Sequence, residues 1–288
     1  MLTQPGDQQR TQPETSRRSA VRQRIPYRDS PRSQSRVCHA EAVKITDEVE
    51  RGAWLVDRMH GGSNVGAIAG YGFEAYVRLL HPRPSDHPSR QGWGVPPDDD
   101  WSTRRWADVA ADRGHVMHPL VQWWRLHNVD EPFHDASSSI GWLDPLVLAA
   151  LVPLLRAGTT TADDVVAGFW EGGSGQKLVA ARTLTLNDGL SYVLATTTLD
   201  ELTDADWGYS LQLGWPGVSM WDYSMQVLWP EDHAWVLTSD IDFDSTIVAG
   251  SRDLVAAILT DGRFEAFEVG PDDDLSWEGD VINGHDPA

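Results

Sequence analysis

The residues with the greatest potential for chemistry lie in one acidic stretch, between Trp229 and Leu259. Three carboxylates alternate along it and two hydroxyl residues follow them directly: Asp240, Asp242, Asp244, Ser245 and Thr246. Carboxylate oxygens are preferred ligands of Mg²⁺ and Ca²⁺, and a carboxylate can also act as a nucleophile. The stretch is therefore the first candidate for a binding or catalytic site.

The pattern Asp242-x-Asp244-x-Thr246 after an apolar strand resembles the nucleophile signature of haloacid-dehalogenase-like phosphatases. That resemblance implies a nucleophilic first Asp and an acid/base second Asp beside magnesium. Such a strand normally opens a large α/β domain, whereas only 44 residues follow Asp244 in this chain of 288. The position argues against a phosphatase of this kind, and a divalent-cation-dependent hydrolase centred on Asp242 and Asp244 is kept as the alternative function.

The same acids also begin like a calcium-binding loop. An EF-hand is excluded, because the sixth position is Ser245 instead of Gly and the twelfth is Ser251 instead of Glu. A looser cation site remains open. The competing interpretation is a strand end whose alternate acids face water, with Asp244 and Ser245 bonding within a turn.

Other candidate groups form no complete constellation. His115, His118, His127 and His134 lie near acids but without an HExxH motif, and Gly172-Gly173-Ser174-Gly175 is not a GxSxG elbow. We therefore predict no catalytic residue, no metal and no cofactor.

The elements that must position the acidic stretch are predicted from hydrophobic periodicity. The stretch itself is predicted to contain a strand over His233–Ile241, a short extended piece, and a helix over Arg252–Thr260 that Ser251 caps. Strands are also expected at Val165–Glu171, Lys177–Leu186, Leu190–Thr198 and Ser224–Trp229, with a hairpin turn at Asn187-Asp188-Gly189.

Helices dominate the expectation for the first half. The sequence predicts a helix capped by Asp47 and Glu50, two strands at Val65–Ala69 and Phe73–Leu80, and helices at Trp101–Asp112, from Pro119, and at Pro145–Arg156 after Asp144. The fold class is therefore α+β, with a helix-rich first half packed on a mainly antiparallel sheet from the second half.

Charge separates the chain into two parts. Residues 1–40 hold eight Arg and three acids, which makes them +5, so the rest carries −25 of the total of −20. We expect residues 1–42 to be a disordered basic tail, outside the native protein if translation starts near Val43, and residues 43–288 to be one α+β domain with an optional boundary near 158. Because residues 41–288 are strongly acidic, they repel phosphate backbones, and nucleic acid is not expected as a partner.

The single cysteine, Cys38, allows no intramolecular disulfide, and no apolar run approaches the ~20 residues of a membrane-spanning helix. The N-terminus lacks the apolar core of a secretory signal. These features predict a cytoplasmic protein.

Tryptophan is the most over-represented aromatic residue, with 14 copies. Several lie inside predicted elements, whereas Trp215 and Trp221 lie in a region with no clear periodicity. Because tryptophan is enriched in interface hot spots, these two join the acidic stretch as candidate binding residues.

Three segments together carry a family resemblance. They are Gly52-Ala53-Trp54-Leu55 with the glycine-rich stretch to Gly72, Thr159-Thr160-Thr161 leading to Phe169-Trp170-Glu171-Gly172, and Trp229-Pro230 with Asp242-Phe243-Asp244-Ser245-Thr246. The arrangement resembles an uncharacterised family of actinobacterial hypothetical proteins over roughly residues 46–283, and it implies no activity. The sequence alone thus favours a non-enzymatic cytoplasmic binding or regulatory module, which engages a basic protein partner through an acidic, tryptophan-rich surface.

Overall fold

The computed structural model describes residues 44–81, 105–126, 140–141, 143–172, 180–186, 189–205, 207 and 225–283. All described residues belong to one compact unit, residues 39–288. The predicted disordered tail and both Trp215 and Trp221 lie outside the described residues.

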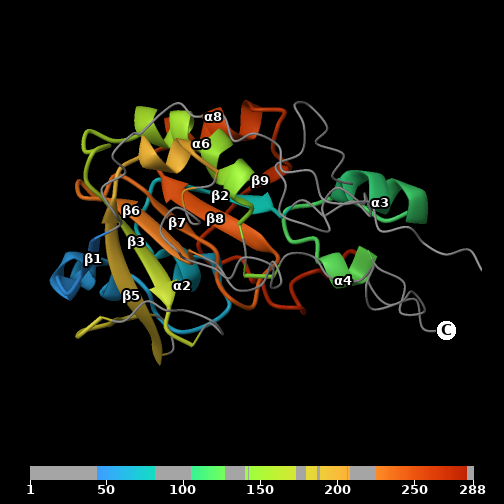
Figure 1. Cartoon of the computed structure of the whole chain (residues 1–288). Coiled ribbons are helices and arrows are strands. Elements are labelled where there is room, and N and C mark those ends of the chain that lie inside the picture. The colour runs from blue at the N-terminus through green and yellow to red at the C-terminus, as the bar shows by residue number, and fades with distance from the viewer. Residues whose placement is uncertain are drawn as a thin grey trace, which may run out of the picture. The chain divides into compact units, whose positions relative to one another are not determined.

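The described residues build a single nine-stranded antiparallel sheet (Figure 1). Its order is β1-β5-β3-β6-β7-β8-β2-β9, and β4 also pairs with β5. The strands are β1 Lys44–Thr46, β2 Ala75–Leu80, β3 Val165–Trp170, β4 Leu184–Leu186, β5 Leu190–Thr197, β6 Val227–Pro230, β7 Val236–Thr238, β8 Ser245–Gly250 and β9 Ala266–Val269. Strands from both sides of residue 158 therefore share one sheet.

Helices cover both faces of this sheet. The described α-helices are α1 Ala53–Val56, α2 Val65–Ala69, α3 Trp106–Arg113, α4 Trp123–Leu126, α6 Pro145–Ala157 and α8 Arg252–Thr260, with 3-10 turns η1 Val49–Gly52 and η4 Glu201–Thr203. The two longest, α6 and α8, pack on one face, and α1 and α2 pack on the other (Figure 1). Because both faces are covered, the central strands β2, β6, β7 and β8 are buried along their whole length.

The alternation of side chains along each strand divides the core into two layers. In β3, Val165 and Ala167 face the layer under α6 and α8, whereas Val166 faces the layer over α1 and α2. A third cluster lies around α3 and α4, where Trp106, Val121 and Trp123 pack with Leu80 at the end of β2, and Phe267 of β9 packs against it.

The two long helices begin where the sequence predicts. Asp144 accepts the backbone N–H of Leu146 (2.9 Å) at the start of α6, and Ser251 accepts that of Leu254 (3.3 Å) at the start of α8. The α+β class, the antiparallel sheet and the pairing of β4 with β5 are likewise confirmed.

One prediction is not confirmed, and two local predictions are corrected. The helix-rich first half is not confirmed, because residues before 158 supply β1 and β2 to the sheet. Val65–Ala69 is the helix α2, whose first two N–H groups bond to Asp273 and Pro271 instead of to a strand. The capping box at Asp47 is wrong: η1 has no side-chain cap, and Asp47 instead accepts the backbone N–H groups of Ala181 and Arg182.

None of the helices in the described ranges is long and apolar enough to cross a membrane.

Candidate functional site

The predicted acidic stretch forms the β7–β8 hairpin, and its three carboxylates lie in different environments. Asp240 follows β7, is buried, and accepts the backbone N–H of Asp242 (3.0 Å). Asp242 is exposed at the tip of the turn, and Asp244 is buried just before β8. The three acids thus alternate along one hairpin, but Asp240 and Asp244 are buried whereas Asp242 is exposed.

Asp244 lies beside the fully buried Arg78 of β2. The Nη2 of Arg78 is 3.3 Å from the Oδ1 of Asp244, its Nε donates to the Oγ of Ser245 (2.8 Å), and its Nη1 donates to the backbone oxygens of Pro119 and Val121 (3.0 and 2.9 Å). Burial lowers the pKa of Arg78 and raises that of Asp244, and the attraction between the two charges opposes both changes.

The carboxylate of Asp244 also accepts the backbone N–H of Trp123, the first residue of α4. The Arg78–Asp244 pair therefore ties the segment that carries α4 to two adjacent strands of the sheet. This arrangement is an internal support, because both charges are enclosed by protein.

Thr246 points to the opposite face of β8 from Ser245, as strand alternation requires. Its Oγ1 lies 2.8 Å from the Nε2 of His81 and 2.5 Å from the Oγ of Ser239. The backbone oxygen of His81 accepts the indole N–H of Trp106 (2.8 Å). All of these side chains are buried, so the hydroxyl–imidazole chain joins β2, β7, β8 and α3 in the interior.

Within the ranges that the structure describes, no three His, Cys, Asp or Glu side chains are grouped so that they could hold a metal ion. The five candidate residues from Asp240 to Thr246 share one hairpin but do not face one site. Asp242 faces solvent, Asp240 is buried and bonds within the turn, Asp244 and Ser245 belong to the Arg78 network, and Thr246 belongs to the His81 network.

A second buried carboxylate fixes the C-terminal segment. Asp280 accepts hydrogen bonds from the Nε2 of His118 (2.8 Å) and from the backbone N–H groups of Gln122 (3.1 Å), Ile282 (3.2 Å) and Asn283 (2.9 Å). Burial opposes ionisation of Asp280, but these bonds outweigh it and lower its pKa below the usual range.

The tautomer of His118 follows from this network. Its Nδ1 accepts the backbone N–H of Leu120 (3.3 Å), so the proton that reaches Asp280 is carried by Nε2. Gln122 adds a bond from its side chain to the backbone oxygen of Leu275 (3.1 Å). Segments 115–126 and 275–283 are therefore joined by several polar contacts.

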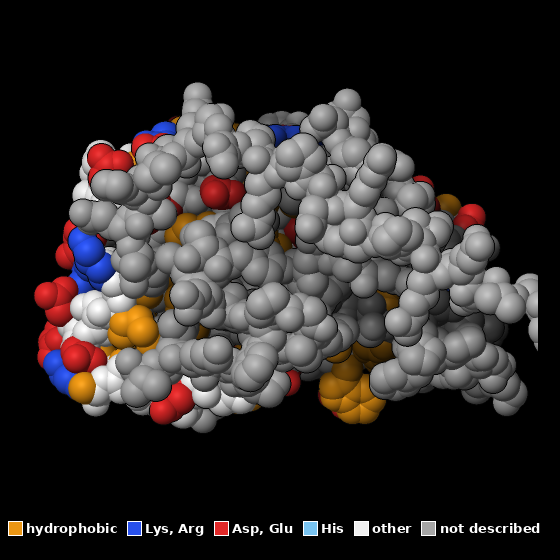
Figure 2. Space-filling view, viewed as in Figure 1, with side chains coloured by type: hydrophobic (Ala, Val, Ile, Leu, Met, Phe, Trp, Pro, Cys, Tyr) orange, Lys and Arg blue, Asp and Glu red, His pale blue; other side chains and the backbone are white. Residues whose placement is uncertain are grey.

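An exposed apolar surface lies on these two joined segments. Its members, here called the apolar patch, are Val116, Trp277, Val281 and Ile282, which are 54%, 64%, 83% and 55% exposed, with the partly buried Trp124. Asn283 bonds to both the N–H and the oxygen of Val116, and the rings of Trp124 and Trp277 lie 6.1 Å apart. Figure 2 shows a group of hydrophobic side chains projecting at its lower right.

Negative charge surrounds Trp277 in the chain. Residues 271–283 contain five acids and no Lys or Arg: Asp272, Asp273, Asp274, Glu278 and Asp280. Burial would raise the pKa of Asp274, but bonds from Ser276 and Ser63 lower it. The segment that carries Trp277, Val281 and Ile282 is therefore rich in carboxylates.

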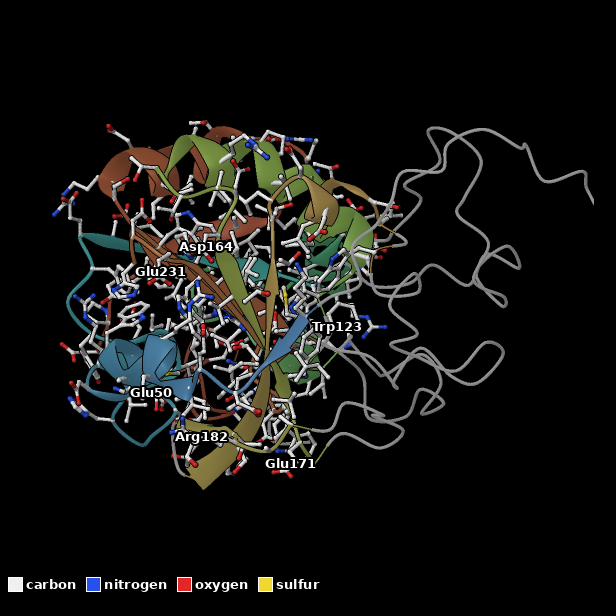
Figure 3. The ribbon with its side chains drawn as sticks, turned by 60° about the vertical axis from the view of Figure 1, so that its left-hand side comes forward. Glu50, Trp123, Asp164, Glu171, Arg182 and Glu231 are labelled. Carbon is white, nitrogen blue, oxygen red and sulfur yellow. The ribbon has the colours of Figure 1, made fainter. Side chains whose placement is uncertain are left out.

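A contrasting polar region lies where β6 turns into β7. Arg51 bridges Asp164 and Glu231 with N–O distances of 2.6 Å, and Figure 3 shows these two acids close together. Nearby, Asp232 accepts the hydroxyls of Thr159 (2.7 Å) and Thr160 (2.8 Å) and the backbone N–H of Thr160 (2.7 Å). These bonds outweigh the effect of burial and lower the pKa of Asp232 to about 2.

Sequence reasoning missed Trp277, which lies within the acidic run that follows Pro271. The available signal was one large aromatic residue inside the polar run Asp-Asp-Asp-Leu-Ser-Trp-Glu-Gly-Asp. Solvation explains the acids of such a run but not the tryptophan.

Comparison with known proteins gives no relative from which to transfer a function. No family model, no curated protein and no solved structure matches the chain. The functional argument therefore depends on the molecule's own surface.

Proposed function

We propose that this chain is a non-enzymatic binding module that acts in the cytoplasm and engages a protein partner through an acidic, tryptophan-bearing surface. The observation that carries the proposal is the exposure of Trp277, at 64%, in the same short segment as the exposed Val281 and Ile282. Single exposed apolar residues are common, but contiguous ones around a tryptophan are typical of protein interfaces.

The patch is also held in one conformation before any partner arrives. Asp280 and Asn283 fix the backbone on both sides of Val281 and Ile282 by bonding to His118, Gln122 and Val116. A surface that is ordered in advance loses less conformational entropy on association. Asp280 and Asn283 therefore support binding by holding the backbone of the patch, although they do not themselves contact the partner.

The charge of the body favours a basic partner. Residues 41–288 carry −25, and of the two segments that form the patch, 271–283 holds five acids without Lys or Arg, whereas 115–126 carries Arg125 over Trp124. Opposite charge speeds encounter and discriminates against acidic competitors.

Affinity capture with matched variants tests the proposal. The wild-type chain, Trp277→Ala and the control Val56→Ala are immobilised and exposed to lysate of the native host, and bound proteins are quantified by mass spectrometry. Val56 is an exposed apolar residue of α1, remote in sequence from the patch. We expect a specific protein to be retained by wild type and control and reduced about tenfold or more by Trp277→Ala. Equal recovery by all three would count against the proposal.

A further inference from the structure

We infer that the apolar patch binds a partner segment in which an arginine is flanked by aliphatic residues, with the guanidinium stacked on the indole of Trp277. This inference rests on the proposed function and specifies the chemistry of the partner. The occupant is a protein segment and not a second copy of this chain.

The two tryptophans of the patch differ in what lies over them. The guanidinium carbon of Arg125 is 4.1 Å from the ring centre of Trp124. The ring of Trp277 is tilted by 49° against Trp124, and no described cation lies over it. Among the described residues, one arginine–indole stack therefore lies beside a second indole, that of Trp277, over which no described cation lies.

Arginine fits the open position better than lysine does. A guanidinium is planar, is weakly hydrated, and can stack on an aromatic ring while its N–H groups bond to a carboxylate. Glu278 is exposed and follows Trp277 directly, so both partners of such a contact occur together. Lysine offers a strongly hydrated point charge and cannot stack in this way.

The remaining patch residues require apolar neighbours on the partner. Val116, Val281 and Ile282 are each more than half exposed and present only hydrocarbon. A purely polar basic segment would leave them in water, whereas aliphatic side chains beside the arginine would bury them.

Charge argues against self-association as the explanation. Two copies would bring together two bodies of −25 each, and the acids next to the patch would face one another. Like charges across an interface oppose association. A basic segment is instead attracted by the acids near the same surface.

The test uses the full chain and four fluorescein-labelled synthetic peptides of the pattern Gly-Leu-X-Leu-X-Ile-Gly, where X is arginine, lysine, citrulline or glutamate. Citrulline keeps the shape of arginine but has no charge. Fluorescence anisotropy is measured at low and at moderate NaCl concentration, because screening weakens exposed charge contacts.

We expect the arginine peptide to bind at least tenfold more tightly than the citrulline peptide and about threefold more tightly than the lysine peptide, with the glutamate peptide weakest. Trp277→Ala should weaken arginine-peptide binding at least tenfold, Trp277→Phe should retain part of it, and Val56→Ala should leave it unchanged. Because Trp277 is mostly exposed, all variants should keep the far-ultraviolet circular dichroism of the wild type.

Equal binding of the arginine and citrulline peptides, or binding unaffected by Trp277→Ala, would overturn the inference. Concentration-dependent dimers in sedimentation velocity that disappear in Trp277→Ala would overturn it in favour of a second copy. If the peptides fail but Trp277→Ala still loses a captured protein, the inference falls and the proposed function stands. If neither peptides nor lysate proteins respond to Trp277, both fall.

Discussion

Asp280 and Asp232 use the same bonding in opposite surroundings. Each collects several N–H or O–H donors from a segment far away in the sequence, and each has a lowered pKa. Asp280 is buried, whereas Asp232 is exposed on the turn between β6 and β7. The two sites have similar hydrogen bonds, but losing these bonds should cost more stability at Asp280. Water can replace lost partners only at the exposed Asp232.

Two arginines that pair with other acids extend the contrast between exposed and buried regions. Arg51 bridges two acids that are about half exposed, and Arg78 lies fully buried against Asp244. Exposed ion pairs contribute little to stability, but removing one member of a buried pair leaves an uncompensated charge in the interior. The buried region should therefore be far less tolerant of substitution.

The largest effect is expected from Asp244→Ala. Removing this carboxylate leaves Arg78 buried without its counter-charge and should reduce the free energy of unfolding by about 3–5 kcal/mol. Urea denaturation followed by tryptophan fluorescence measures the change. The double variant Arg78→Met with Asp244→Leu should lose less than Asp244→Ala alone, and a larger loss in the double variant would contradict the role of charge.

Asp280→Asn should have the next largest effect. The amide keeps the shape but loses the charge that strengthens the bonds from His118 and three backbone N–H groups, so we expect a loss of about 2 kcal/mol. Hydrogen exchange should increase first in segments 115–126 and 275–283. An increase in exchange spread evenly over the sheet would contradict the prediction that Asp280 stabilises mainly these two segments.

Asp232→Asn should give a smaller, pH-dependent change. The folded pKa of about 2 lies below the unfolded value of about 3.9, so Asp232 contributes stability above about pH 4 and loses it as the pH falls toward 2. The difference between wild type and variant should be at most about 1 kcal/mol after solvent screening, and should shrink over that window. A difference that grows on acidification would contradict this sign.

Arg263→Gln should have the smallest effect. Its side chain pairs with Asp261 two residues earlier, and the pair is formed within one surface turn. We expect less than about 0.5 kcal/mol in thermal or urea unfolding. A loss as large as that of Asp280→Asn would remove the distinction between exposed and buried sites.

Much of the fold follows from local sequence signals. Asp144 and Ser251 identify the starts of α6 and α8 because a carboxylate or hydroxyl there can bond to the exposed N–H groups of a first turn. Apolar runs identify β3 and the central part of β5, Tyr192–Ala195, because both faces of these residues are covered. Because each of these signals depends on only a few neighbouring residues, it can be recognised in the sequence.

The site is much less readable. Asp244 shows the pattern of a solvent-facing strand end, yet Arg78, 166 positions earlier, encloses it. Val65–Ala69 has the composition of a strand, yet its N–H groups bond to residues near position 272. Pairings between such distant residues leave no periodic trace, so sequence could indicate the acidic hairpin but not what surrounds it.

The strand order has a consequence for how the molecule is made. The apolar strand β2 is synthesised early, but its two neighbours in the sheet, β8 and β9, are the last two of the described strands to leave the ribosome. Proteins dominated by such distant pairings fold slowly. During translation β2 therefore has both edges unpaired until β8 and β9 are made, and an apolar strand with unpaired edges is prone to aggregate.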